Sequence, residues 1–382
     1  MAKLYTGIDI GSERLKMAVC GDQGVVSVAI EEVPESLVKD GRVTSFETMA
    51  EVIRDAARKN KINAKDCALA LHSRDVFTRR ITVPAMTEEE LGLNLPFEFR
   101  DYIADDKDKY SFDYAVLGMK RDAAGNPVEM DILAAAAPTE TIEAYRTMLR
   151  RAGFKLKMAA PDIMAYANII AAFEKRQPPA SMPAAGATLP NGADTPVLDA
   201  AGGSAAAGIA ASGPASALPN GATAPQMPAA SRDYCFLDVG YDSTTVYLFP
   251  QGKYEVARIV EFGVGLLASA VADYFSVDES LARTYLSTDY EGAQRIQPCL
   301  DLYERLGVEA ARIVSFFNFN YPESQLNVLH YCGNGSRIAP LIDALREHVS
   351  VDLVDINAVM PASAVSPDRL RVCPAAVGIA LR

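Results

Sequence analysis

Two stretches of this sequence share one construction, and this repetition constrains the fold more than any other feature does. In residues 234–249 an apolar run ends at Asp238, a turn follows, and a second run of β-branched and aromatic residues begins at Thr244. This is the pattern of a β-hairpin. Residues 5–20 repeat it around Asp9. One such hairpin is weak evidence for a shared site, whereas two that open the two halves of one chain are much stronger.

The residue types at both turns suit the binding of phosphate. Gly11 and Gly240 lack a Cβ atom, so the backbone amides beside them can approach an anion closely. Successive amides in such a turn form a concave site for phosphate. Asp9 and Asp238 place a carboxylate where a hydrated cation could bind. The simpler alternative, that each aspartate only caps its turn, stays open for either hairpin taken alone. Hydroxyl groups accompany the turns at Ser12, Ser243 and Thr244.

Composition and charge narrow the function classes. The chain has 382 residues, of which 49% are hydrophobic, so it can bury sizeable cores and should form two or more domains. Its formal net charge of −12 argues against a broad surface for nucleic acid or anionic membranes. No apolar run approaches the roughly 18 residues of a membrane span, so we expect no direct membrane insertion. We also expect no signal peptide, because the N-terminus leads directly into a strand.

The cysteines and histidines do not indicate a metal site or a catalytic set. The six cysteines are scattered without a Cys-x-x-Cys pair, and most lie in apolar strand contexts. We interpret them as small core residues of a reduced, cytosolic protein. The three histidines are far apart in the sequence, and we interpret them as core or surface residues: His72, His330 and His348.

The first half of the chain alternates strands and helices. Hairpin strands, a helix over residues 45–58 and a strand over residues 67–71 indicate an α/β layer with a mixed sheet. Residues 77–159 then follow the order βαββαβ, which is typical of a split-βαβ, ferredoxin-like fold, and we interpret them as an inserted module. The helical spacing of three apolar residues in this module favours a core face over a docking face: Leu91, Leu95 and Phe99.

A segment of unusual composition separates the two halves. Residues 177–230 contain no aromatic residue, no lysine or arginine, and only two acidic residues. Such a segment cannot bury enough surface to offset its ordering entropy, so we expect a flexible linker. Beyond the second hairpin, a strand over residues 327–332 leads into a Gly-Asn-Gly-Ser turn before a helix, and residues 374–382 form a closing helix rich in alanine.

Taken in this order, the motifs resemble the actin-like ATPase superfamily, which includes actin, sugar kinases, DnaK-type chaperones and FtsA. The resemblance implies an α/β fold of two ribonuclease-H-like domains that close over ATP, with an inserted βαββαβ subdomain of the FtsA and PilM type. The sequence is most similar to the PilM family of type IV pilus assembly proteins, and it resembles that family everywhere except in the linker. Four stretches carry the similarity: residues 81–91, 139–146, 150–154 and 376–382.

The resemblance also implies a division of the chain into parts. These are a first actin-like domain at residues 1–76 with its interdomain helix at 160–176, the inserted subdomain at 77–159, a disordered linker at 177–230, a second actin-like domain at 231–373 and a C-terminal helix at 374–382.

By position, the resemblance implies a site for ATP and Mg²⁺. Asp9 and Asp238 would hold Mg²⁺ mainly through its waters, which suits a cation that dehydrates reluctantly. Asp162 has the position of a carboxylate that orients the attacking water, although the helix dipole alone also favours an aspartate there. The phosphate turns would hold Gly11, Ser12 and Lys16 on one side and Gly240, Ser243 and Thr244 on the other, and the adenosine would contact Gly333, Gly335 and Ser336.

Two positions depart from the superfamily pattern. Asn334 replaces the central glycine of the adenosine turn, and asparagine is the residue that most readily adopts left-handed geometry after glycine. A Glu-x-x-Lys contact to adenosine keeps its acidic member, Glu279, but has Ala282 in place of the lysine. Arg283 could substitute, although it lies about 100° further round the helix.

The resemblance implies a cytoplasmic ATP-binding scaffold that reaches the inner face of the cell membrane through a partner. That partner would be the short tail of a PilN-like membrane protein, docked in a groove between the first domain and the inserted subdomain. Other pilus assembly proteins and further copies of the chain are additional expected partners, and nucleic acid is not. The sequence leaves open whether ATP is hydrolysed, and a weak ATPase is compatible with it.

Two other functions stay open on the sequence. An FtsA-like division protein usually ends in an amphipathic membrane helix, whereas this chain stops at Arg382 within its closing helix. A small-molecule kinase of the same fold needs a catalytic aspartate in a substrate cleft and generally lacks the βαββαβ insertion.

Overall fold

The computed structural model describes residues 3–39, 41–103, 107–177, 232–324 and 326–381. Met1–Arg176 and Ser231–Arg382 belong to one compact unit, and Gln177–Ala230 is separated from it. The segment for which we predict a linker lies, apart from its first residue, outside the described residues. The fold and the sites below are those of the compact unit.

The first half forms a five-stranded mixed sheet with the order β10-β6-β1-β2-β3. Its strands are β1 (Tyr5–Ile10), β2 (Arg14–Gly21), β3 (Gly24–Glu32), β6 (Asp66–Leu71) and β10 (Lys155–Pro161). β1 and β2 form the predicted hairpin and β3 extends it in antiparallel pairing, whereas β1, β6 and β10 run parallel. The connection from β3 to β6 contains β4 (Val38–Lys39), β5 (Arg42–Val43) and α1 (Phe46–Lys59).

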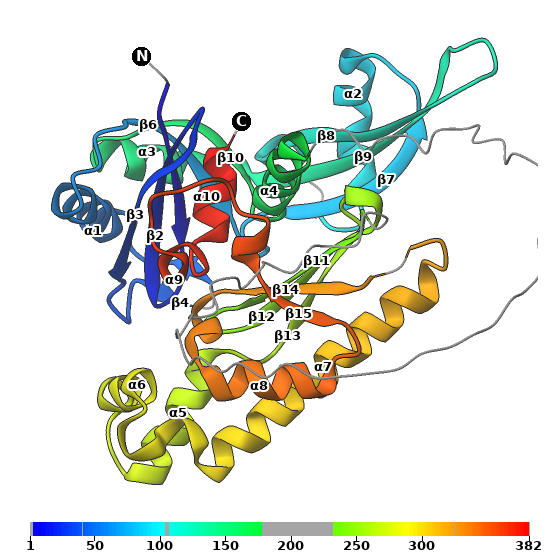
Figure 1. Cartoon of the computed structure of the whole chain (residues 1–382). Helices are drawn as coiled ribbons and strands as arrows, with labels where there is room; N and C mark the ends of the chain where they lie inside the picture. Colours follow the sequence, from blue (N-terminus) through cyan, green and yellow to red (C-terminus); the bar gives the residue numbers. More distant parts are fainter. Residues whose placement is uncertain (1–2, 40, 104–106, 178–231, 325, 382) are drawn as a thin grey trace, which may run out of the picture. The chain divides into compact units, whose positions relative to one another are not determined.

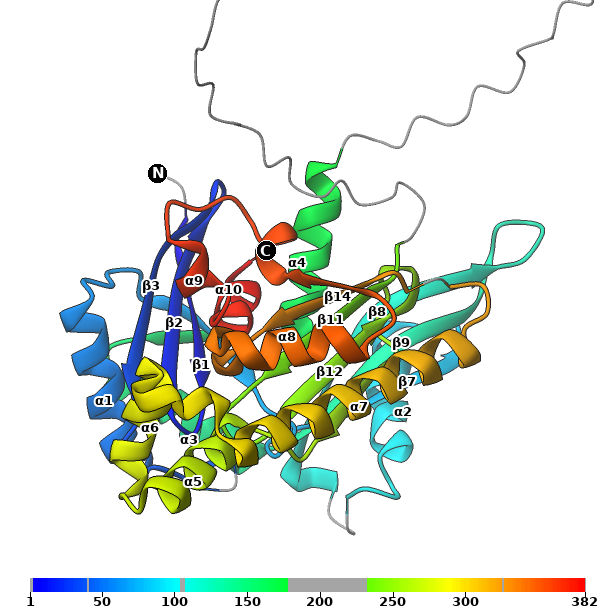
Figure 2. The same cartoon turned by 60° about the horizontal axis from the view of Figure 1, so that its bottom comes forward.

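The second half repeats this topology. Its sheet has the order β13-β12-β11-β14-β15, so an antiparallel three-strand meander is again followed by two parallel strands. The strands are β11 (Tyr234–Val239), β12 (Thr244–Phe249), β13 (Val256–Val260), β14 (Val328–Cys332) and β15 (Asp352–Asp355). Apolar residues of this sheet pack in one core with helices on one of its faces (Figure 2), namely α5 (Val264–Phe275), α6 (Glu279–Thr288), α7 (Gln297–Asn320) and α8 (Ala339–His348).

Two helices fill the space between the sheets (Figure 1). They are α4 (Ile163–Arg176) and α10 (Pro374–Ala380). Tyr166 of α4 and Val377 of α10 share a core with Tyr5 of the first sheet and Phe236 of the second. The close approach of the two helices requires a glycine, because a Cβ atom on Gly378 would lie 2.1 Å from the carbonyl oxygen of Ala165. The halves are therefore joined by packed apolar surface.

The remaining helices are short or lie in the connections. They are α9 (Pro367–Leu370) and the 3-10 helices η1 (Lys107–Lys109), η2 (Pro250–Gly252), η3 (Tyr290–Arg295), η4 (Asn334–Arg337) and η5 (Ile356–Ala358). Across the ranges that the structure describes, no helix combines the length and the apolar content that a membrane crossing needs.

The module predicted at residues 77–159 has the expected element order but a different pairing. Its elements are β7 (Phe77–Pro84), α2 (Glu88–Glu98), β8 (Tyr110–Arg121), β9 (Pro127–Pro138), α3 (Thr139–Arg151) and then β10. β7, β9 and β8 form an antiparallel three-stranded sheet. α2 covers it with Leu91, Leu95 and Phe99, which are buried as predicted.

The last two elements of this stretch belong to the first domain, which corrects the ferredoxin-like interpretation. β10 pairs in parallel with β6, and α3 packs beside α1 with Tyr145, Met148 and Leu149 in the core of the first sheet. Element order does not specify which strand pairs with which. The apolar face of α3 is needed to complete the core around α1, so the strand that follows α3 reaches β6 and not β7.

One buried histidine lies in the second sheet. His330 of β14 has no exposed surface and packs against the rings of Tyr234 and Phe236. Its Nδ1 atom lies 3.3 Å from the carbonyl oxygen of Cys235, and its Nε2 atom has no hydrogen-bond partner within the described chain. Burial lowers the pKa of His330 from 6.5 to about 4. The residue is a core histidine, which is one of the two alternatives expected from the sequence.

This burial predicts a pH dependence of stability. Because the folded pKa lies below the unfolded one, the unfolded state takes up the proton first, so stability falls as the pH drops from about 6.5 towards 4. The loss should reach about 3 kcal/mol at full protonation. In urea titrations, His330→Phe should lose this part of the acid dependence, whereas a His348→Gln control should keep it. Parallel pH profiles for wild type and His330→Phe would contradict the assignment.

Candidate functional site

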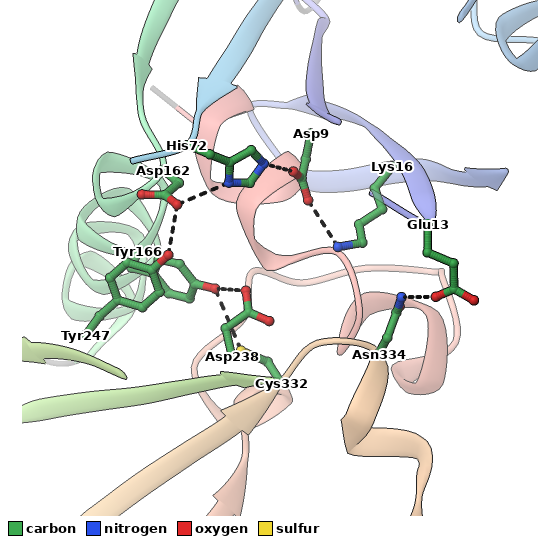
Figure 3. A network of polar contacts seen from close by, with 10 residues as sticks. All are labelled: Asp9, Glu13, Lys16, His72, Asp162, Tyr166, Asp238, Tyr247, Cys332 and Asn334. Carbon is green, nitrogen blue, oxygen red and sulfur yellow. Dashed lines mark hydrogen bonds and ion pairs between the residues drawn. The ribbon is translucent and has the colours of Figure 1, made fainter. Parts of the chain in front are cut away.

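The shared topology brings the carboxyl ends of parallel strands from both sheets to one region. In the first sheet Asp9 lies near the end of β1, His72 directly follows β6, and Asp162 directly follows β10. In the second, Asp238 lies near the end of β11 and Gly333 directly follows β14. Ligand sites of α/β folds form at such carboxyl edges. Figure 3 shows the polar side chains of this region, which we call the central network.

Asp9 is the most buried carboxylate of the central network. One of its oxygens lies 3.2 Å from Nζ of Lys16, and the other lies 2.9 Å from Nε2 of His72 (Figure 3). Burial by itself would raise the pKa of Asp9, but the charge of Lys16 and the hydrogen bond from His72 outweigh it, so this pKa lies well below its usual range. Burial would lower the pKa of Lys16, yet the charge of Asp9 raises it. Asp9 and Lys16 therefore form a buried ion pair.

His72 connects Asp9 to Asp162. Its Nδ1 atom lies 3.3 Å from Oδ2 of Asp162, which also accepts a hydrogen bond of 2.9 Å from the hydroxyl of Tyr247. A histidine can donate from both ring nitrogens only when it is protonated. Burial opposes that state, but the hydrogen bonds to Asp162 and Asp9 outweigh it and raise the pKa of His72 well above its usual value. A protonated His72 therefore bridges the two carboxylates.

The sequence analysis did not include His72 in the site. The available signal was its position directly after an apolar strand, next to the strand that carries Asp9. Because that neighbourhood depends on parallel pairing between distant strands, the local pattern around His72 does not show it. Asp162, which the sequence analysis does include, is fixed beside it by a hydrogen bond of 2.9 Å from its backbone amide to the carbonyl oxygen of Leu71.

The carboxylate of Asp238 is hydrogen-bonded to a tyrosine that stacks on a second tyrosine. The hydroxyl of Tyr166 donates a 2.6 Å hydrogen bond to Oδ2 of Asp238, and the Tyr166 ring stacks on Tyr247 with 4.3 Å between ring centroids. Enclosure by the protein raises the pKa of Asp238, the charges of Asp9 and Asp162 add to this, and Lys16 offsets part of it. The two predicted metal-site aspartates therefore differ: Asp9 is neutralised by cations, and Asp238 is not.

The two hairpin turns close in the same way. The amide of Gly11 donates to the carbonyl oxygen of Arg14, and the amide of Gly240 donates to that of Ser243, each at 3.0 Å. A Cβ atom on Gly240 would lie 2.8 Å from the oxygen of Ser243, so this turn needs glycine. The turns also contact each other, because the Ser12 hydroxyl donates to the carboxylate of Asp242.

Thr244 has a structural hydrogen bond. Its buried hydroxyl donates to the carbonyl oxygen of Phe262 at 2.8 Å. The hydroxyl of Thr244 therefore donates its proton to the connection between β13 and α5, and the predicted contact of Thr244 with phosphate would need its backbone amide.

The predicted adenosine turn contacts both Asp238 and the first hairpin. Gly333 has a φ of +84°, and a Cβ atom there would lie 2.2 Å from Oδ1 of Asp238. The left-handed residue of this turn is thus Gly333, and Asn334 begins the 3-10 helix η4. The side-chain amide of Asn334 donates a 2.9 Å hydrogen bond to Glu13 of the first hairpin. The hydroxyl of Ser336 donates to the carbonyl oxygen of Gly333 at 2.6 Å and closes the turn.

A cavity of about 540 Å³ lies beside the turns. Both halves line it, with Glu13, Glu35, Arg283, Asn334 and Arg337 among the polar contributors. Arg283 pairs with Glu35 across it.

The predicted Glu279 is not among the residues that line this cavity, and its carboxylate accepts a 2.6 Å hydrogen bond from Tyr241. Ala282 is fully buried. The available cation on this helix is therefore Arg283, which lines the cavity.

A direct protein cage for a metal is not present in the part of the chain that the structure describes: no three His, Cys, Asp or Glu side chains are grouped to hold an ion.

The charge balance of the central network predicts opposite effects of two similar substitutions. Asp9→Asn leaves Lys16 and His72 without their shared anion and should lower stability by about 3 kcal/mol. Asp238→Asn keeps an oxygen for the Tyr166 hydroxyl and removes a carboxylate of raised pKa, so stability at pH 7 should hold or rise. Urea denaturation measures both. Equal losses in the two variants would contradict the different charge states, and adding Lys16→Met to Asp9→Asn should recover part of the first loss.

Comparison with known proteins finds one family model and several solved structures to which this chain is similar. The family model described as type IV pilus assembly protein PilM matches residues 7–188. The structure described as a PilM-PilN type IV pilus biogenesis complex has a TM-score of 0.69 and 20% identity, with 99% of this chain and 98% of that chain covered. The ethanolamine utilization protein EutJ from Carboxydothermus hydrogenoformans has a TM-score of 0.54 and 11% identity, with 100% and 89% covered. The fold is that of the actin-like ATPases, and residues 7–188 are similar to the PilM family of type IV pilus assembly proteins.

Proposed function

We propose that this chain is an ATP-binding scaffold of type IV pilus assembly that captures the cytoplasmic tail of a PilN-like inner-membrane protein. The observation that supports nucleotide binding is the pair of hairpin turns, which are closed by the same kind of backbone hydrogen bond. Each turn lies next to an aspartate of the central network. The match of residues 7–188 to the PilM family model and the PilM-PilN title of a similar structure support the capture of such a tail. Capture of such a tail would bring the protein to the inner face of the cell membrane.

The charges of the central network fit Mg²⁺ and phosphate. Three carboxylates, Asp9, Asp162 and Asp238, lie among two cations, Lys16 and His72. Burial raises the pKa of Asp238, and the charges of Asp9 and Asp162 add to this rise. Asp238 and, through water, Asp9 would hold the cation, which would neutralise phosphate charge when bound. The amides of the two turns would hold phosphate oxygens.

Asp162 is the proposed base of a weak ATPase. One of its oxygens accepts hydrogen bonds from His72 and Tyr247, which fixes the orientation of the carboxylate. The other oxygen would orient a water molecule.

Calorimetry with Mg-ATP tests the proposed nucleotide binding. Asp238→Asn should bind Mg-ATP at least about tenfold more weakly than wild type, since one charged ligand of the cation is lost. Asp343→Asn on the exposed surface of α8 is the matched control and should bind like wild type. Equal affinity of wild type and Asp238→Asn would remove Asp238 from the site, and absence of binding to wild type would reduce the proposal to a scaffold without nucleotide.

A groove between α1 and α3 fits the tail of the partner. It encloses about 490 Å³, and the residues that line it are Phe46, Glu47, Glu140, Glu143, Ala144, Thr147, Met148 and Arg151. Its floor is apolar, whereas its rim has three glutamates and one arginine, which pairs with Glu47 at 3.2 Å. Both helices belong to the first domain in the structure, so this groove differs from the expected position between the first domain and the inserted subdomain. The excess of acidic groups favours a tail with basic residues next to an apolar anchor.

A peptide titration tests this groove. The probe is a synthetic peptide of the cytoplasmic N-terminal residues of the PilN-like protein from the same cell. Ala144→Arg places a long cation in the groove at a half-buried helical position that arginine tolerates, and it should abolish measurable binding. Ala171→Arg makes the same exchange at an exposed site of α4 and should leave binding unchanged. Binding to Ala144→Arg as tight as to wild type would place the tail elsewhere, and filaments on lipid without peptide binding would favour an FtsA-like function.

A further inference from the structure

Helix α2 carries apolar residues on two opposite faces. Leu91 and Leu95 are buried against the sheet of β7, β9 and β8. On the outer face Leu93 is 69% exposed and Phe97 is 61% exposed. The packing of α2 within its own chain therefore explains one apolar face and leaves the other unexplained.

The outer face also contains two residues that are unfavourable inside a helix. Glycine and proline are the two residues least favourable in a helix interior, and Gly92 and Pro96 both lie inside α2. Neither cost is explained by contacts within the chain. A Cβ atom on Gly92 would meet nothing within 4 Å, so packing does not require glycine there. Pro96 has no N–H group, so the carbonyl oxygen of Gly92 lacks its helical hydrogen bond.

These four residues form one continuous surface, which we call the α2 outer face: Gly92, Leu93, Pro96 and Phe97. Leu93 and Phe97 are four residues apart, as are Gly92 and Pro96, so two adjacent ridges run along the helix. The ridge of Leu93 and Phe97 has large apolar side chains, whereas the ridge of Gly92 and Pro96 projects less from the helix. Such a surface accepts the ridge of another helix at close range, because the position without a side chain allows the backbones to approach.

The charges around the α2 outer face specify the partner. Glu88 and Glu89 are exposed in the first turn of α2, and Asp101 is exposed beyond its end. Lys107 lies with its Nζ atom 5.6 Å from the centroid of the Phe97 ring, so the chain itself places a cation against this aromatic face. The exposed carboxylates at this margin outnumber the exposed cations, so it complements lysine and arginine more than glutamate and aspartate; the carboxylates are those of Glu88, Glu89, Glu90 and Asp101, and the cations are Arg100 and Lys107.

We propose that the α2 outer face docks an amphipathic helix of a partner protein whose apolar stripe is flanked by lysine and arginine. The partner helix inserts apolar side chains beside Leu93 and Phe97, lies closest to α2 at Gly92, and pairs its cations with Glu88 and Glu89. This surface is separate from the groove between α1 and α3, and it shares no residue with that groove.

The test uses model helices with the full-length protein. The probe is a fluorescent amphipathic peptide of leucine and lysine, about five helical turns long, and its matched controls are a peptide of the same composition in scrambled order and a leucine–glutamate counterpart. Wild type should bind the amphipathic lysine peptide and neither control. Leu93→Ser/Phe97→Ser should bind the amphipathic lysine peptide at least about tenfold more weakly than wild type, because two apolar contacts are lost. Leu281→Ser/Phe319→Ser, which removes two exposed apolar residues elsewhere, should bind like wild type.

Two milder variants keep the test independent of folding defects. Gly92→Ala stabilises an exposed helix but fills the position of closest approach, so it should raise thermal stability and weaken the peptide at the same time. Glu88→Gln/Glu89→Gln should weaken binding and reduce its salt dependence.

Three results would overturn the proposal. The first is equal binding of the lysine, glutamate and scrambled peptides. The second is wild-type affinity in Leu93→Ser/Phe97→Ser. The third is self-association of the wild type in sedimentation that this variant abolishes, since the occupant of the face would then be a second copy of the chain.

Discussion

The pairing of buried charges around Asp9 is the interaction on which the rest of the site depends. Asp9 is 2% exposed, and a carboxylate in that position requires cations and hydrogen bonds. Lys16 of β2 and His72, which follows β6, supply them. His72 also contacts Asp162, which follows β10, so the position of Asp162 depends on the same interaction. These contacts thus hold four segments of the first sheet together at its carboxyl edge. The second half contributes Tyr247 to the same network, so the network also links the two sheets.

The parts of this site that the sequence predicted are the local ones. A hairpin is specified by an apolar run, a turn and a second run, so both hairpins and the positions of Asp9 and Asp238 follow from short stretches. The role of His72 depends on parallel pairing between strands that are far apart in the sequence, which no local pattern encodes. The same reason explains the wrong ferredoxin-like interpretation, because the βαββαβ order was correct while the pairing of β10 with β6 was not predictable from that order.

The corrected position of α3 and β10 changes how the inserted stretch should be understood. The separate sheet comprises residues 77–138, and α2 is the helix that it carries. Tyr145, Met148 and Leu149 of α3 belong to the core of the first domain, so a deletion through residue 159 would remove core residues together with the module. The α1–α3 groove is therefore built on the first domain, whereas the α2 outer face lies on the smaller sheet. These are two separate candidate surfaces for partner proteins.

Nucleotide can affect these surfaces only if it interacts differently with two arrangements of the halves. Three contacts at the opening of the site already connect the halves: Ser12 with Asp242, Asn334 with Glu13, and Arg283 with Glu35. Each contains a carboxylate, and that of Asp242 lies at the second hairpin turn, where a phosphate group would be repelled. Binding of phosphate should therefore separate Ser12 from Asp242 or require Mg²⁺ to offset the charge. A nucleotide that displaces one of these contacts would bind this arrangement and a more open one with different affinities, which is the difference that a nucleotide-dependent switch needs.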